Sequence, residues 1–243
     1  MKSILKSFIA GIVIIAIGAG IIIATLAAND WSFRGPDFEM KTYTEQNENS
    51  TVKLKVGAGI LKTEFYDGDK IEIIYPDSKA YKNGLEETDG TLSFDSSIKW
   101  YASVFSFGLW NAPETVVRLP ANRTLNISLD MNAGKVELAA GNYGRIDADV
   151  SAGTLSATGI NCSKLDCDVS AGTVHVNNAV CPDIEIDISA GTLKLGVNGK
   201  KSEYTVKVDV SAGTCNLSDQ TGTTDKRLFV DCSAGTVKVD FSE

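Results

Sequence analysis

Histidine is almost absent from this sequence, because His175 is the only one among 243 residues. It stands between two valines on a predicted strand, where alternation points it outward, so a serine or cysteine nucleophile has no evident histidine partner. The sequence also lacks a phosphate-binding loop, a C-x-x-C pair and a helix with metal-ligand spacing. We therefore expect no catalytic residues, no zinc site and no enzymatic activity.

Positive charge is also scarce. Residues 29–243 carry all 31 acidic residues but 21 of the 23 basic ones, which leaves this part of the chain with a net charge of −10. Nucleic acids and teichoic-type polyanions select basic surfaces. We therefore expect no nucleic-acid partner, and a polyanionic partner would need bridging cations.

The clearest feature that is present is a repeat of the form D-x-S-A-G-T, followed by an aliphatic residue or cysteine. Counted from glycine to glycine, the steps are 19, 19, 19, 22 and 22 residues. A fixed period near 20 residues is typical of a solenoid. The five copies begin at Asp149, Asp168, Asp187, Asp209 and Asp231, and a degenerate copy begins at Asp130.

Each repeat reads as two strands joined by a bend. Apolar and polar residues alternate, the alternation stops at Ser-Ala-Gly-Thr, and it then resumes. The glycine offers the positive φ angle that a tight bend can use. Stacked coils would place equivalent residues about 4.8 Å apart. The expected inward columns are Met131, Val150, Val169, Ile188, Val210 and Cys232; Val136, Leu155, Val174, Leu193, Cys215 and Val237; and Leu138, Ala157, Val176, Leu195, Leu217 and Val239.

These patterns predict an all-β fold, a single-stranded β-solenoid with coils of 19–22 residues, preceded by one N-terminal transmembrane helix. We expect regular coils over 121–243 and capping coils with an aromatic loop over 51–120, because terminal units of a solenoid are atypical. Residues 29–50 are polar and are expected to be a juxtamembrane linker. The last strand, 237–241, is expected at the edge of the sheet, where Lys238 and Asp240 would discourage edge-to-edge pairing.

The first 28 residues are expected to be a short cytoplasmic tip and a membrane anchor. Lys2 and Lys6 precede an uncharged apolar run over 8–28, which is long enough as a helix to cross a bilayer. The two lysines favour a cytoplasmic N-terminus, with the rest of the chain outside. The alternative is a cleaved signal peptide with a cleavage site near 25–27, although the apolar run exceeds the usual length for one.

An irregular aromatic stretch interrupts the strands over 98–113. One interpretation is a loop folded over the open end of the core, and the other is an exposed apolar patch that contacts a partner or the membrane surface. The residues of this candidate contact loop are Trp100, Tyr101, Phe105, Phe107 and Trp110.

The aspartate that opens each repeat should form an outward column, with Asp147, Asp166 and Glu185 as a partial second column. Like charges at this spacing repel by roughly 0.9 kcal/mol per neighbouring pair in water. Bend-capping hydrogen bonds from the carboxylates would offset this locally, and bound Ca²⁺ is the alternative. The candidate calcium ladder is Asp130, Asp149, Asp168, Asp187, Asp209 and Asp231; no other cofactor is expected.

Five cysteines and a threonine rank complete the candidate residues. Cys167, Cys215 and Cys232 fall in aliphatic columns, so we expect buried small hydrophobes. Cys162 and Cys181 are 19 residues apart and should be neighbours in adjacent coils, at a spacing that allows a disulfide. The threonines that end the S-A-G-T bends should stabilise the sheet through hydroxyl ladders.

The order of these features resembles the order found in a known protein family. The coil over 54–60, the lead-in over 117–120 and the repeated S-A-G-T with flanking aliphatics are similar to the bacterial putative-adhesin family, whose domain of unknown function forms a single-stranded β-solenoid. The resemblance covers about residues 51–243 and implies the fold. It implies no catalytic or binding residues, because none are established for the family. Relatives resemble extracytoplasmic parts of envelope-stress proteins that act with membrane partners.

Two functions follow from the sequence. The first is a non-enzymatic, adhesin-like scaffold of a bacterial cell envelope, held in the membrane by residues 8–28 and binding a cell-wall or surface ligand. The alternative is an envelope-stress sensing or regulatory module that acts with a membrane regulatory protein. Only 1–6 lie inside before the apolar run, too few for a signalling domain, which favours the scaffold.

Overall fold

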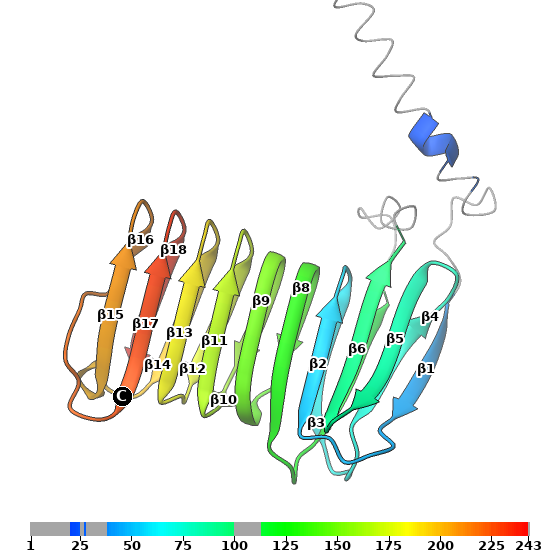
Figure 1. The fold of residues 1–243 in the computed structure, drawn as a ribbon, viewed down its shortest axis with the longest axis horizontal. Coiled ribbons are helices and arrows are strands. Elements are labelled where there is room, and N and C mark those ends of the chain that lie inside the picture. The colour runs from blue at the N-terminus through cyan, green and yellow to red at the C-terminus, as the bar shows by residue number, and fades with distance from the viewer. Residues whose placement is uncertain (1–19, 25–26, 28–37, 100–112, 243) are drawn as a thin grey trace, which may run out of the picture.

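The computed structural model of the chain describes residues 20–24, 27, 38–99 and 113–242, and residues 38–99 and 113–242 form a β-solenoid (Figure 1). Each coil contributes one strand to each of two sheets, and the strands of neighbouring coils run parallel. The apolar residues between the two sheets form one continuous core. The all-β prediction is thus confirmed.

The first sheet is the one that faces the viewer in Figure 1. Each of its central strands lies parallel to its neighbours, and β8 and β9 continue through the bend into the second sheet. Its strands, in spatial order, are β6 (Thr91–Ile98), β2 (Thr51–Val56), β8 (Leu125–Leu138), β9 (Gly141–Thr158), β11 (Lys164–Val169), β13 (Asp183–Ile188), β17 (Lys226–Cys232) and β15 (Tyr204–Val210).

The second sheet lies behind the first and receives the chain after each bend. A short strand, β10 (Ile160–Asn161), and a 3₁₀ turn, η1 (Lys201–Glu203), lie on the return segments. The strands of this sheet, beside the C-terminal parts of β8 and β9, are β7 (Glu114–Pro120), β3 (Ile60–Tyr66), β12 (Thr173–Ala179), β14 (Thr192–Asn198), β18 (Thr236–Ser242) and β16 (Thr214–Cys215).

Antiparallel strands close the N-terminal end. In the first sheet, β5 (Tyr81–Thr88) forms a hairpin with β6 through a turn in which Asp89 and Gly90 have φ angles of 49° and 72°. In the second sheet, β4 (Glu72–Asp77) pairs with β7, and β1 (Glu39–Thr44) pairs with β4. The antiparallel pairs replace the parallel ladder at this end, as expected for an atypical terminal unit.

The coils do not stack in the order of the sequence at the C-terminal end. Strand β17 pairs with β13 on one side and with β15 on the other. Strand β18 likewise lies between β14 and β16, but β16 pairs only with Thr236 and Val237. Among the described residues, 238–241 therefore have a strand partner on one side only, and the predicted edge over 237–241 is confirmed for all but its first residue. The interior coil is the better buried one: Leu228 and Val230 are 0% and 3% exposed, whereas Val208 and Val210 in the outer coil are only partly buried.

The same inversion occurs at the N-terminal end. Strand β2 lies between β6 and β8, and β3 lies between β7 and β8. The strands over 51–66 therefore form an interior coil, and the later segments 91–98 and 114–120 lie outside them (Figure 1). The expected capping region over 51–120 thus contains one regular coil as well as the cap.

The inward columns follow the predicted register. Val150 pairs with Val169 and Val169 with Ile188, and in the second sheet Leu155 pairs with Val174 and Val174 with Leu193. All members of the three predicted columns are buried except Val210, Cys215 and Leu217. These three lie in the outermost coil, which has a neighbour on one side only.

The glycines of the bends serve a different purpose from the predicted one. Only the bends at Gly59 and Gly134 have a positive φ, of 121° and 108°, and the five S-A-G-T glycines have none. A Cβ atom at Gly191 would lie 2.6 Å from the carbonyl oxygen of Gly172 and 2.5 Å from Cγ1 of Val169. Glycine is therefore required because the backbones of neighbouring coils touch at the bend.

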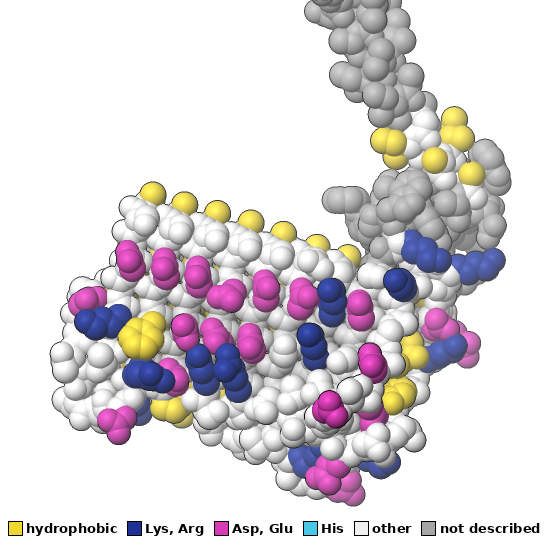
Figure 2. Space-filling model, viewed as in Figure 1, with side chains coloured by type: hydrophobic (Ala, Val, Ile, Leu, Met, Phe, Trp, Pro, Cys, Tyr) yellow, Lys and Arg dark blue, Asp and Glu magenta, His cyan; other side chains and the backbone are white. Residues whose placement is uncertain are grey.

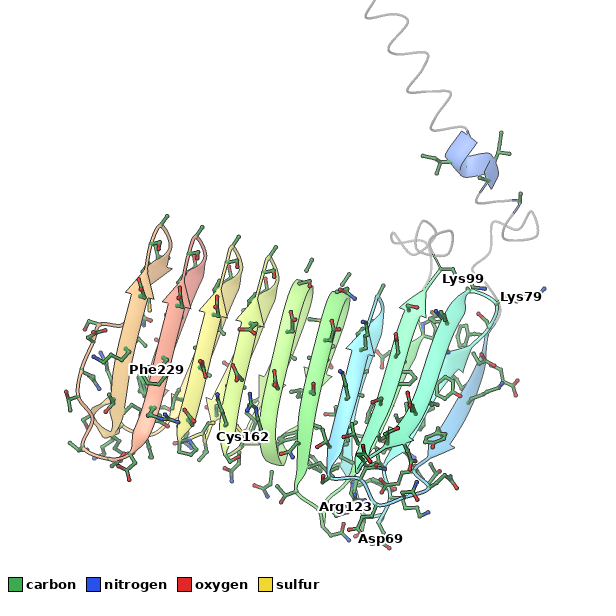
Figure 3. All side chains as sticks on the ribbon, viewed as in Figure 1. Asp69, Lys79, Lys99, Arg123, Cys162 and Phe229 are labelled. Atoms are coloured by element: carbon green, nitrogen blue, oxygen red, sulfur yellow. The ribbon has the colours of Figure 1, made fainter. Side chains whose placement is uncertain are left out.

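The polar segment before residue 51 is not only a linker. Residues 39–44 form β1, and Glu45 and Asn49 are 2% and 1% exposed. The guanidinium of Arg123, at the base of the solenoid in Figure 3, donates to the Glu45 carboxylate and to the carbonyl oxygen of Asn49. The prediction of a spacer over 29–50 is thus wrong for 39–50, because β1 buries no residue fully and therefore shows no alternation of apolar and polar residues.

Glu87 on β5 holds the segment that follows β1. Its carboxylate accepts hydrogen bonds from the Tyr43 hydroxyl at 2.8 Å and from the backbone N–H groups of Gln46 and Asn47 at 2.7 and 2.9 Å. Desolvation raises the pKa of Glu87, but these donors outweigh it and lower the pKa to about 2.

The predicted membrane anchor lies mostly outside the described residues. Residues 20–24 and 27 are helical. Within the part of the chain that the structure describes, no helix is long and apolar enough to cross a membrane.

The bend contact predicts a selective effect of adding one methyl group. Gly191→Ala should lower the free energy of unfolding by about 1–3 kcal/mol, because the new Cβ overlaps the backbone of the next coil. Gly196→Ala, five residues away in the same coil, should change it by less than about 0.5 kcal/mol, since its nearest contact would be an ordinary 3.4 Å to the Asn178 nitrogen. Urea titrations of both variants test this, and equal losses would contradict it.

Glu87 predicts a pH dependence of stability. Its pKa is lower in the folded than in the unfolded chain, so its stabilisation is complete above the unfolded value and is lost as the pH falls toward about 2. Glu87→Gln should lower the melting temperature at pH 7 and reduce the loss of stability between about pH 4.5 and 2. Glu86→Gln, one residue away and exposed, should leave both unchanged. Identical melting curves for the Glu87 variant and the wild type would refute this role.

Candidate functional site

The first sheet presents an uninterrupted row of six aspartates on its outer surface, visible as a line of acidic side chains in Figure 2. Lys55 on β2 continues the row at one end, with its Nζ 3.4 Å from the carboxylate of Asp130. The predicted column is confirmed, but its order follows the coils rather than the chain. It runs Asp130, Asp149, Asp168, Asp187, Asp231 and Asp209.

The five aspartates beyond Asp130 have no partner in the part of the chain that the structure describes. Among the described residues their carboxylates form no hydrogen bond and no ion pair, so the expected bend-capping hydrogen bonds are not formed. Partial burial, and then the neighbouring carboxylates, raise the pKa of Asp168 above its ordinary value. The row therefore consists of like charges held at strand spacing and neutralised at one end only.

The second acidic column is neutralised. Arg145 Nη2 lies 2.7 Å from Asp166 Oδ2, and Lys164 Nζ lies 3.1 Å from the same oxygen and 2.7 Å from Glu185 Oε2. Each basic side chain thus reaches diagonally into the next coil. In the following coil the column continues with Phe229, labelled in Figure 3, whose ring lies 5.8 Å from the Arg227 guanidinium.

The carboxylates of the row do not gather around a common point. In the described ranges, no group of three or more His, Cys, Asp or Glu side chains is placed to hold a metal ion. Ca²⁺ takes six to eight oxygen ligands. The aspartates therefore form a line of single carboxylates, and the calcium ladder has no chelating group in this arrangement.

The cysteines lie where the repeat predicts. Cys162 and Cys181 are adjacent in neighbouring coils and 4% and 1% exposed, and both are free thiols in the structure. Contact with Cys181, and then burial, raise the pKa of Cys162. Cys167 and Cys232 are fully buried, whereas Cys215 is only partly buried.

The outer surface of the second sheet carries the predicted threonine rank. Thr154, Thr173, Thr192, Thr236 and Thr214 are in register, and the Oγ1 atoms of the last two are 3.2 Å apart. The candidate aromatic contact loop, from Trp100 to Trp110, lies outside the described residues.

Sequence reasoning missed a second feature of this surface. His175, Lys194 and Lys238 stand in register on three adjacent coils, beside a hollow floored by Gly196. The signal in the sequence was the glycine itself, because it takes an outward position of the alternating stretch 192–198 without being part of a bend.

The two acidic columns predict opposite effects for two substitutions on one strand. Asp168→Asn should raise the free energy of unfolding by about 0.5–1 kcal/mol at low ionic strength, because it removes repulsion from both neighbours in the row. Asp166→Asn should lower it by a similar amount, because Arg145 and Lys164 lose their shared acceptor.

The increase in the free energy of unfolding caused by Asp168→Asn should depend on salt and pH. Screening of the carboxylates should make this increase smaller in 1 M NaCl. Because the folded-state pKa of Asp168 is raised, the penalty in the wild type is complete at neutral pH and fades as the pH falls through that pKa. Thermal unfolding at pH 7 and pH 4 tests this, and shifts of the same sign in both variants would contradict it.

Several solved structures are similar to this chain. A "putative adhesin" from Bacteroides fragilis is 16% identical with a TM-score of 0.45, and the match covers 84% of this chain and 98% of that one. A "putative cell adhesion protein" from Clostridium sporogenes is 13% identical with a TM-score of 0.37, covering 85% and 100%. Likenesses at this level do not bear on function.

The sequence itself identifies the family. No curated protein matches the chain. The family model described as Toastrack DUF4097 matches residues 60–243, which is most of the chain and includes every S-A-G-T repeat. The protein therefore belongs to the Toastrack DUF4097 family.

Proposed function

We propose that this protein is a non-enzymatic, adhesin-like interaction scaffold, anchored in a bacterial cell membrane and displayed on its outer side. The observation that carries the proposal is the row of aspartates on the first sheet. Six carboxylates point outward from one flat surface at strand spacing, and five of them have no partner among the described residues. A regular array of this kind suits a ligand that also repeats.

The rigidity of the scaffold supports this function. Each carboxylate in the row except Asp209 lies on a strand whose neighbouring residues are buried on the inward side, such as Val150 and Ile188. The positions of the charges are therefore fixed before a partner arrives, which reduces the entropy lost on binding. Several weak contacts along one rigid surface can then act together as one multivalent site.

The charge of the row defines the partner. A repeated carboxylate surface would bind a cationic ligand directly, or a cell-wall or surface polymer through bridging cations. The apolar run over 8–28, with Lys2 and Lys6 before it, supports anchoring with the solenoid outside the membrane. No cofactor is part of this proposal.

The alternative function is an envelope-stress module that acts with a membrane regulatory protein. The two proposals differ in what the membrane segment does. A scaffold needs the segment only as an anchor, and its solenoid should bind the ligand on its own. A regulatory module needs the segment to contact its partner.

In-cell crosslinking distinguishes the two functions. The full chain and a form that begins at Asn29 are crosslinked in cells and purified, and the captured partners are identified. We expect both forms to retain wall glycan or surface proteins. Capture of integral membrane regulators by the full chain alone would replace the scaffold with the regulatory module.

The aspartate row can be tested in the same experiment. Asp149→Asn, Asp168→Asn and Asp187→Asn combined should reduce capture of the surface partners. The control combines Glu48→Gln, Glu86→Gln and Asp225→Asn, which remove the same charge from exposed positions off the row. Equal capture by both triple variants would show that net charge, rather than the row, attracts the partner.

A further inference from the structure

Strand β12 contains a bulge on the outer surface of the second sheet. The register between β12 and β14 shifts between Val176 and Ala179, so Asn177 and Asn178 together lie beside Gly196. Asn178 has a φ of 54°, a left-handed conformation that is uncommon outside glycine, and both amide side chains are exposed. Bulges and strained residues of this kind occur preferentially at functional sites.

The bulge borders a hollow of about 320 Å³. Gly196 provides its floor because it has no side chain, and its nearest atoms lie no closer than 3.4 Å to where a Cβ would stand. This volume is at the lower end of the range for small-molecule sites, roughly 300–1,000 Å³. The polar residues around the hollow are His175, Asn177, Asn178, Lys194, Lys238, Asp240 and Ser242.

The charges at the hollow differ from those of the first sheet. Lys194 and Lys238 are in register on adjacent strands, so their ammonium groups repel each other. Asp240 lies 2.9 Å from Lys238 and neutralises it, but Lys194 has no ion pair or hydrogen bond within the described ranges. One uncompensated positive charge thus remains beside the hollow.

The net negative charge of the chain does not prevent an anion from binding there. The row of aspartates is on the opposite outer surface, and stacked sheets are separated by about 10 Å. At physiological ionic strength, charges in solvent are largely screened beyond about 8 Å. An anion at Lys194 therefore experiences mainly the side chains around the hollow.

We propose that this hollow binds an acidic saccharide unit, which is a sugar ring that carries a carboxylate or a phosphate. The Lys194 ammonium pairs with the anionic group. The amides of Asn177 and Asn178, the His175 imidazole and the Asp240 carboxylate supply both donors and acceptors for ring hydroxyls. This inference rests on the proposed scaffold function and identifies a ligand class on the second sheet.

The single histidine of the chain allows a direct test. His175 lines the hollow, so its imidazole signals in a proton NMR spectrum report on this site alone. The full chain, without a histidine tag and embedded in lipid nanodiscs, is titrated with tetragalacturonate, glucose 6-phosphate, inorganic phosphate and neutral maltotetraose. Isothermal titration calorimetry in the same samples gives the affinity.

We expect at least one of the two acidic saccharides to shift the His175 signals saturably, and maltotetraose to leave them unchanged. Whether the site prefers a sugar carboxylate or a sugar phosphate is decided by which of tetragalacturonate and glucose 6-phosphate binds more tightly. Lys194→Gln and Gly196→Val should each weaken binding about tenfold or more, the first by removing the charge and the second by filling the hollow. Lys207→Gln, an exposed lysine on the first sheet, is the matched control and should bind as the wild type does.

Three results would overturn the proposal. Wild-type affinity in Gly196→Val, with its melting temperature unchanged, would show that the hollow is not used. Equal binding of inorganic phosphate would reduce the site to a simple anion site. A lack of any shift with either saccharide would refute the ligand class. If crosslinking still captures surface partners in that case, the scaffold function stands without this site; if it captures none, both proposals fall.

Discussion

Neighbouring coils of this solenoid lie about 4.8 Å apart, which is the distance that backbone hydrogen bonds between parallel strands require. At this spacing each side chain stands directly above the equivalent one in the next coil. At Gly191 the spacing leaves no room for a side chain, because a Cβ would overlap the carbonyl oxygen of Gly172. The backbone contact at the bend therefore sets both the S-A-G-T motif and the alignment of every other column.

The same spacing creates an electrostatic conflict on the outer surface. Repeating a sequence repeats its charges, so an acidic position becomes a row of acids. The chain resolves this conflict at Asp166, where Arg145 reaches across from the neighbouring coil and Lys164 approaches from the same strand. It does not resolve it at Asp168, two residues further along the same strand. Because a buried core on the other side of the sheet holds the row in place, the repulsion reduces stability without changing the structure.

Periodicity predicted the inward columns because a strand that buries alternate residues has apolar residues at alternate positions of its sequence. It could not predict the order of the coils. Every coil presents the same two parallel edges, so the coil over 226–242 can pair on either side of the one over 204–215. The structure places Leu228 and Val230 inside and leaves Val208 and Val210 in the outer coil.

The candidate sites could be predicted to different degrees, because the sequence shows which positions repeat but not which coils and side chains meet. The aspartate row belongs to the repeat and could be listed in full from the sequence. Its lack of partners could not, because ion pairs depend on diagonal contacts between coils. Strand β1 was missed because none of its residues is fully buried, so its sequence shows no alternation of apolar and polar residues.

The hollow at Gly196 arises from a departure from the repeat. A glycine on β14 and a two-residue bulge on the neighbouring strand β12 interrupt the outward column of side chains there. In a molecule whose surface is otherwise repeated, a site of discrete size can form only where the repeat is broken. The regular part of this solenoid therefore suits extended, repeating partners, and its exceptions are the places where a small ligand can be recognised.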